Sequence, residues 1–243
     1  MKFLSFLLTL ACCLLPLAGC AKSPVGGVTT TAPNRLEVTL TLAQTLDPNF
    51  YYGVAFDDNP SDGVGPRAVV GNTATLNGIM DGNWRTLVRY HLNQFEVFYR
   101  STPSDPATER QILGTALFFS QPRATANSLN FVLNLDAQVS SGNFFFAHTS
   151  GATPTLATDS FDINFVATNT IIIAGRDDRI KPVDAYEAAA TSTFFEFQIG
   201  STRRATILDP TNDRRLDIDP SFGSVNFGQI DVTQLDLNVT RNR

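Results

Sequence analysis

Residues 36–42, Leu-Glu-Val-Thr-Leu-Thr-Leu, alternate strictly between apolar and polar side chains. A period of two is typical of a strand that turns one face to a protein core and the other to water. The pattern returns at residues 129–135, 161–165 and 230–239. These segments predict an antiparallel sheet with one buried face, in which Asp162 and Asn164 point to solvent.

Further runs are more continuously apolar and are also predicted to be strands. They are residues 50–56, 84–91, 95–99, 112–119, 143–148, 171–174 and 194–199. Short polar turns at 91–94 and 140–143 predict hairpins. The one helix candidate is Val183–Ala190, which comes after Pro182. We therefore predict an all-β protein, an antiparallel β-sandwich with at most one short helix, and a barrel-like β fold is the alternative.

The chain begins with the three parts of a secretory signal. Met1 and Lys2 give a positive start, Phe3–Leu15 is an apolar run, and small residues continue up to Cys20. This order of charge, apolar run and small residues is typical of exported proteins. The run is too short to span a membrane, which takes roughly 20 apolar residues.

The end of this segment, Leu17-Ala18-Gly19-Cys20, resembles the lipobox of bacterial lipoproteins at all four positions. The resemblance implies that residues 1–19 are a signal peptide, that Cys20 carries a diacylglycerol, and that this lipid attaches the protein to a membrane. An ordinary signal peptide with an incidental cysteine is the alternative. Family members retained at the inner membrane often carry Asp after the cysteine, whereas this chain carries Ala21. The resemblance thus favours the outer membrane if the organism has one, and otherwise the cell surface.

The exported part of the chain is constrained by its composition. Residues 20–34 hold the lipidated cysteine and a small-residue stretch that is typical of a flexible tether. Residues 35–243 are then expected to form a β-sandwich domain, either whole or as two subdomains. The formal charge of −5 without a clustered basic face argues against nucleic-acid binding. Cys12 and Cys13 leave with the signal, so no disulfide or cysteine metal site is expected.

An acidic turn, Asp57–Gly63, comes directly after the predicted strand at 50–56. Asp57, Asn59 and Asp62 offer the oxygen ligands that Ca²⁺ prefers. The loop pattern of Ca²⁺ sites is nevertheless broken, because Asp62 stands at its sixth position and Ala68 at its twelfth. A polar turn without a cofactor is therefore the favoured interpretation, and a Ca²⁺ site is the alternative.

Three aromatic residues, Trp84, Tyr90 and Tyr99, lie on the two strands of one predicted hairpin. If Tyr90 and Tyr99 face water, they can form a stacking platform for a sugar ring. The simpler interpretation is packing in the core, and for a lone Trp in a β domain it is the favoured one. The stretch from Tyr51 to Arg100 also resembles a segment of uncharacterised exported bacterial β proteins, and that resemblance carries no activity with it.

Catalytic motifs are scarce. The two histidines, His91 and His148, stand at predicted strand ends, and the chain contains no G-x-S-x-G motif. We name no catalytic residue and predict a lipid-anchored extracytoplasmic binding or structural protein of the bacterial envelope, with a protein or a glycan as its ligand. A carbohydrate-binding module is one alternative. The other is a hydrolase that uses turn carboxylates, since glycoside hydrolysis needs only two such groups about 5–10 Å apart.

Overall fold

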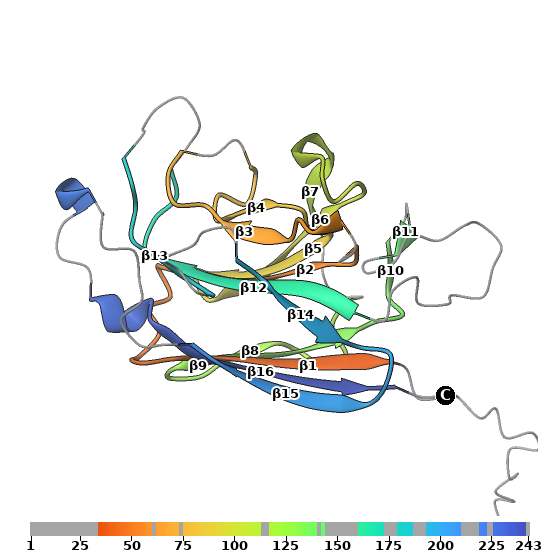
Figure 1. The fold of residues 1–243 in the computed structure, drawn as a ribbon. Coiled ribbons are helices and arrows are strands. Elements are labelled where there is room, and N and C mark those ends of the chain that lie inside the picture. Colours follow the sequence, from red (N-terminus) through yellow and green to blue (C-terminus); the bar gives the residue numbers. More distant parts are fainter. Residues whose placement is uncertain are drawn as a thin grey trace, which may run out of the picture. The chain divides into compact units, whose positions relative to one another are not determined.

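A computed structural model describes residues 34–59, 62–72, 75–112, 117–139, 142–143, 160–172, 179–186, 193–209, 219–222 and 226–241. The chain divides into two units, Met1–Thr31 and Ala32–Arg243, and every described residue belongs to the second. In this unit two large antiparallel sheets pack face to face, and a small sheet covers the outer face of one of them (Figure 1). The predicted antiparallel β-sandwich is confirmed, and neither large sheet closes into a barrel over the described residues.

The first large sheet has five strands. In spatial order they are β15 (Arg203–Leu208), β16 (Val232–Thr240), β1 (Arg35–Leu42), β9 (Ser128–Asn134) and β8 (Arg123–Ala124). The alternating segment that opens the domain is its central strand, because Leu36 pairs with Val239 on one side and with Leu133 on the other. The first strand of the domain is thus next to the last.

The second large sheet has seven strands. Its path is β13 (Val183–Ala185), β12 (Ser160–Thr168), β2 (Tyr51–Asp57), β5 (Thr86–His91), β6 (Gln94–Arg100) and β7 (Glu109–Ile112), and β14 (Phe195–Gln198) pairs with the other half of β12. The predicted hairpin at 91–94 is present as a two-residue turn between β5 and β6. Leu92 and Asn93 both take positive φ there, as the favoured hairpin turn requires.

The main core lies between the two large sheets. Leu36, Leu40 and Leu133 from the first sheet meet Phe56 and Phe161 from the second, and all five are at most 1% exposed. Their apolar sides face each other because strand side chains alternate between faces. Burial of this apolar area is the main stabilising contribution in a chain without disulfides among its described residues.

A second, smaller core lies on the outer face of the seven-stranded sheet. There β3 (Pro66–Ala68) and β4 (Met80–Gly82) form a two-stranded sheet that covers Trp84, Leu87 and Phe98. The remaining described elements are three short 3₁₀ helices and one isolated strand pair. The helices are η3 (Pro106–Thr108), η5 (Pro220–Phe222) and η6 (Phe227–Gln229), and the strands are β10 (Gln138–Val139) and β11 (Gly142–Asn143).

This cover corrects one expectation from the sequence. Asp162 and Asn164 are 2% and 1% exposed and do not point to water. The Asn164 amide donates to the carbonyl oxygens of Pro66 and Thr193 over 3.0 and 2.9 Å, and its own oxygen accepts from the backbone of Tyr186. The alternation correctly places Asp162 and Asn164 on the face of β12 that points away from the main core, but a second layer buries that face.

The predicted helix at Val183–Ala190 is wrong over its described part. Val183–Ala185 is strand β13, which pairs with β12 and places Val183 and Ala185 in the second core, while residues 187–190 lie outside the described residues. Packing against a neighbouring strand here overrides helix propensity. Of the run at 112–119, Ile112 ends β7 and Phe118 forms an isolated bridge with Leu133, while residues 113–116 lie outside the described part. Residues 171–172 form no strand, and 144–148 and 173–174 are not described.

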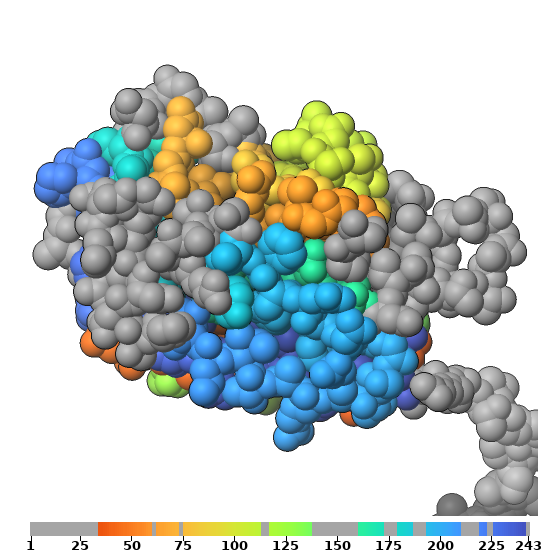
Figure 2. All heavy atoms as spheres, in the orientation of Figure 1, coloured from red at the N-terminus to blue at the C-terminus, as the bar shows by residue number. Residues whose placement is uncertain are grey.

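The chain passes between the two large sheets several times, and one of these connections is short. Strand β14 belongs to the seven-stranded sheet and β15 to the five-stranded sheet, and residues 199–202 join them. Figure 2 shows these two strands, in blue, across one face of the molecule. Arg203 and Arg204 are exposed on β15.

Candidate functional site

A groove of about 950 Å³ lies at one open side of the sandwich. Its walls come from the strands that form the edges there, β7 of the seven-stranded sheet and β8 of the five-stranded sheet, with the hairpin β5–β6. Its apolar lining residues are Tyr90, Phe95, Ile112, Phe118, Phe119, Pro122 and Ala124. An open groove of this size with aromatic walls is typical of a ligand site.

Aromatic rings form the floor of this edge groove. Phe95 makes edge-to-face contacts with Tyr90, Phe118 and Phe131 at centroid distances of 5.1, 6.5 and 6.2 Å. The bridge from Phe118 to Leu133 fixes the neighbouring segment on β9, and the next residue, Phe119, is left 41% exposed. The groove thus offers an aromatic floor of half-buried rings, with the more exposed ring of Phe119 at its side.

Amides and one carboxylate supply the polar lining: Asn93, Gln94, Glu96, Gln111, Ser120 and Gln121. Glu96 is the one charged residue among the lining residues, and it pairs with Arg89 at 2.7 Å. Gln111 donates to the other Glu96 oxygen over 3.1 Å. The groove therefore presents hydrogen-bonding groups without an unneutralised charge.

Edge strand β7 is positioned by a buried ion pair. Arg100 on β6 pairs with Glu109 on β7 at 3.0 Å, and the two side chains are 0% and 1% exposed. The Arg100 guanidinium also lies 4.0 Å from the ring centroid of Trp84. Glu109 accepts from the backbone and side chain of Asn77, so both carboxylate oxygens are satisfied. These buried contacts hold β7, which supplies one wall of the groove, against β6.

The three aromatic residues predicted to stack on a sugar are all buried. Trp84 is 0% exposed and lies in the second core, under Arg100. Tyr90 and Tyr99 are 3% and 5% exposed and lie in the main core, on the opposite face of the sheet. Tyr90 and Tyr99 therefore lie on one face of the sheet, at different positions along the β5–β6 ladder, and Trp84 packs on the other face. Of the three, Tyr90 alone lines the groove, and its hydroxyl is 3.0 Å from the amide oxygen of Asn93.

The predicted Ca²⁺ ligands lie around the turn after β2. Asp57 is fully buried at the strand end, whereas Asn59 and Asp62 are exposed. Asp57 accepts from the Asn59 backbone over 3.2 Å, and Asp62 accepts from the amides of Asn59 and Asn83 over 3.0 and 2.9 Å. No group of three His, Cys, Asp or Glu residues within the described ranges is arranged to hold a metal ion. These contacts are those of a polar turn.

Sequence reasoning missed the partner of Asp57. Asp162 on β12 lies directly opposite Asp57 on β2, although the two are far apart in the chain. Burial, with the charges of Asp58 and Asp62, raises the pKa of Asp57 to about 7. Burial and then Glu196 and Asp62 raise the pKa of Asp162 to about 6. The alternation at 161–165 indicates which face of its strand Asp162 lies on. It does not indicate that Asp57 lies opposite on the neighbouring strand.

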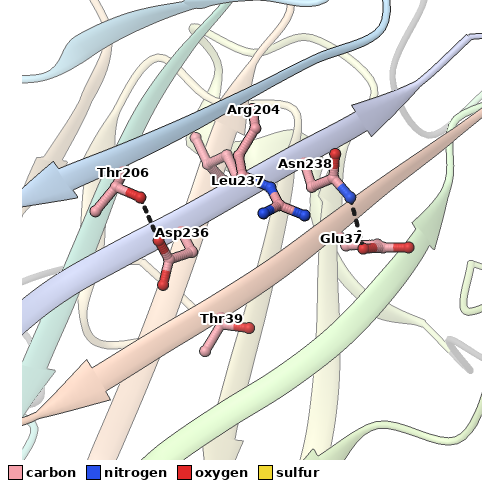
Figure 3. A pocket seen from close by; sticks show the side chains of 7 residues that line it. All are labelled: Glu37, Thr39, Arg204, Thr206, Asp236, Leu237 and Asn238. Carbon is pink, nitrogen blue, oxygen red and sulfur yellow. Dashed lines mark hydrogen bonds between the residues drawn. The ribbon is translucent and has the colours of Figure 1, made fainter.

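A second hollow, of about 320 Å³, lies on the outer face of the five-stranded sheet (Figure 3). Its polar side chains come from three neighbouring strands and are Glu37, Thr39, Arg204, Thr206, Asp236 and Asn238. Asn238 donates to Glu37 over 2.8 Å and Thr206 to Asp236 over 2.5 Å. These groups largely satisfy one another across the strands, as cross-strand pairs on a solvated face do.

The remaining predicted sites are less informative. His91 stacks on Tyr51 at 3.8 Å and contacts the carbonyl of Phe50, while His148 and Cys20 lie outside the described residues. In the described part of the chain, no helix has the length and apolar character to cross a membrane. Comparisons with known protein families, with curated proteins and with solved structures find no match to this chain.

Proposed function

We propose that the chain is a lipid-anchored extracytoplasmic binding protein of the bacterial envelope, and that it binds a glycan in the edge groove. The single observation that carries the binding role is the combination of aromatic floor and amide rim in a groove of about 950 Å³. Attachment to the membrane rests on the lipobox resemblance at Cys20.

A glycan fits the chemistry of this groove. Sugar rings present apolar C–H faces that pack on aromatic rings, which Phe95, Phe118 and Phe119 supply. Their hydroxyl groups are both donors and acceptors, and Gln111 and Gln121 carry both functions on one side chain. The absence of an unpaired charge on the lining residues favours a neutral glycan over a phosphorylated or strongly anionic one.

The binding role is tested with the full chain carrying Cys20→Ser, which removes the lipid. We expect this protein to bind members of an array of neutral glycans, and Phe119→Ala to weaken that binding at least tenfold in a calorimetric titration. Leu208→Ala is the matched control, because Leu208 is an apolar side chain that is 70% exposed on β15. If no arrayed glycan binds, or if both variants bind equally, the edge groove is not a glycan site.

The anchor is tested separately in cells. Cys20→Ser is expected to move the protein from the membrane fraction to the soluble fraction and to end incorporation of labelled palmitate. Two acyl chains hold a protein on a membrane firmly, whereas one binds only marginally, so release should be nearly complete. Unchanged membrane attachment would contradict the anchor and leave the glycan proposal standing.

A further inference from the structure

Three acidic side chains form a row on the outer face of the seven-stranded sheet. Asp162 is directly opposite Asp57 on one side and Glu196 on the other. Directly opposite residues of antiparallel strands point to the same face, with Cβ atoms about 4.5–5.5 Å apart. The carboxylates of Asp57 and Asp162 therefore share one small region beside the turn that carries Asp62.

Two members of this row are deeply buried and each has an oxygen without a partner. Asp57 and Asp162 are 0% and 2% exposed, and within the described part of the chain Oδ2 of each makes no hydrogen bond. Each lone oxygen comes from a different strand. This is an observation independent of the acidic composition of the turn, because most buried polar atoms in proteins are paired.

Nearby positive charge is already engaged elsewhere. Arg85 pairs with Asp58 at 2.5 Å and donates to the carbonyls of Arg100 and Ser101. No ion pair joins a described Lys or Arg to Asp57 or Asp162. A buried carboxylate without a counter-charge is costly, so these two acids need a cation or a proton.

We propose that Asp57 and Asp162 together bind one Ca²⁺ ion through their unpartnered Oδ2 atoms, and that Asp62 adds negative charge beside it. Ca²⁺ takes about six to eight oxygen ligands in flexible geometry, drawn from carboxylates, carbonyl oxygens and water, so the two carboxylates would supply the charged part of its shell. Burial raises the pKa of both acids because it disfavours their charged forms. A bound cation would offset the same unfavourable burial of charge. The site differs from the predicted set because Asp162 replaces Asn59 as a ligand, and it is independent of the edge groove.

Calorimetric titration of Ca²⁺ into the EGTA-treated full chain carrying Cys20→Ser tests the site. We expect one Ca²⁺ per chain and a rise in Tm, because a ligand that binds only the folded state stabilises it. Asp162→Asn should abolish both responses. Asp236→Asn, which removes a carboxylate from the other sheet, should leave both unchanged.

A second variant keeps the test decisive if Asp162→Asn does not fold. Asp62→Asn changes an exposed residue and should weaken Ca²⁺ binding several-fold without preventing it. Absence of Ca²⁺ binding by the folded parent would overturn the proposal. So would a Tm that does not respond to Ca²⁺ and falls as pH rises from about 4 to 7, because the folded chain would then hold a proton that the unfolded chain loses.

Discussion

The Nζ of Lys181 donates a hydrogen bond to the carbonyl oxygen of Gly78 over 3.0 Å, and the lysine side chain is fully buried. The backbone N–H of Lys181 also donates to the carbonyl of Val70. In the described residues no carboxylate pairs with this lysine. The Lys181 ammonium thus attaches its segment to the layer that covers the seven-stranded sheet. Burial disfavours the charged form of this ammonium.

Stability should therefore rise with pH above neutrality. Burial lowers the pKa of Lys181 from 10.5 to about 7, so between those values the unfolded chain binds a proton that the folded chain does not. The free energy of unfolding then increases with pH by up to about 1.4 kcal/mol per pH unit in that window. Urea unfolding at pH 7, 8 and 9 measures this slope. Lys181→Met should flatten it and raise stability at pH 7, and an unchanged slope would contradict the assignment.

Gly78 has both a positive φ and a close neighbour, and two glycine variants can distinguish these two effects. Its φ is +73°, and a Cβ there would meet Cγ2 of Ile171 at 2.8 Å. Gly63 has a similar φ of +68° with nothing within 4 Å of the same position. Gly63→Ala should lose about 1 kcal/mol from the backbone alone, and Gly78→Ala about 2–4 kcal/mol because overpacking is added. Equal losses in urea unfolding would show that Ile171 gives way freely.

The buried pair behind the edge groove should be far more sensitive than an exposed one. Glu109→Gln leaves the Arg100 charge buried without its counter-ion and should cost about 3–5 kcal/mol. Glu37→Gln is the control, since the Arg35–Glu37 pair spans 3.6 Å and its side chains are 48% and 40% exposed. That change should cost less than about 1 kcal/mol. Chemical denaturation of both variants gives the comparison, and similar losses would argue against a structural role for the buried pair.

The β5–β6 turn holds a leucine in a conformation that leucine rarely adopts. Leu92 has φ of 49° and is 58% exposed, so neither backbone preference nor burial explains its presence. Leu92→Asn places a residue that tolerates positive φ there and should raise stability by about 1 kcal/mol. A rise in Tm without loss of the fold checks this, and a fall would mean that Leu92 makes a stabilising contact.

The sequence was most informative where one face of a strand meets the main core. The alternation at residues 36–42 correctly predicted which side chains of β1 are buried, because a single layer covers that face. It failed on β12, whose second face is covered by β3 and β4, two three-residue strands with no periodic signal of their own. It also failed at Val183–Ala185, where pairing with β12 decides the conformation.

The sites were less predictable than the fold for the same reason. The edge groove combines the β5–β6 hairpin with residues 118–124 of the other sheet, so its lining exists only after both sheets have packed. The opposition of Asp57 and Asp162 depends on the register of two strands far apart in the chain. Local patterns carry no information about such pairings. For Tyr99, by contrast, the sequence had left burial in the core open as an interpretation.

Because β1 lies between β9 and β16, the order in which the chain is synthesised matters for folding. The first strand of the domain cannot gain its second neighbour until residues 232–240 have left the ribosome. Pairing over such sequence distance makes for slow folding, and a nascent chain stopped before Val232 exposes one whole edge of β1 to other molecules. The five-stranded sheet should therefore form only once residues 232–240 are available, and chains that end before Val232 should aggregate instead of forming a partial sandwich.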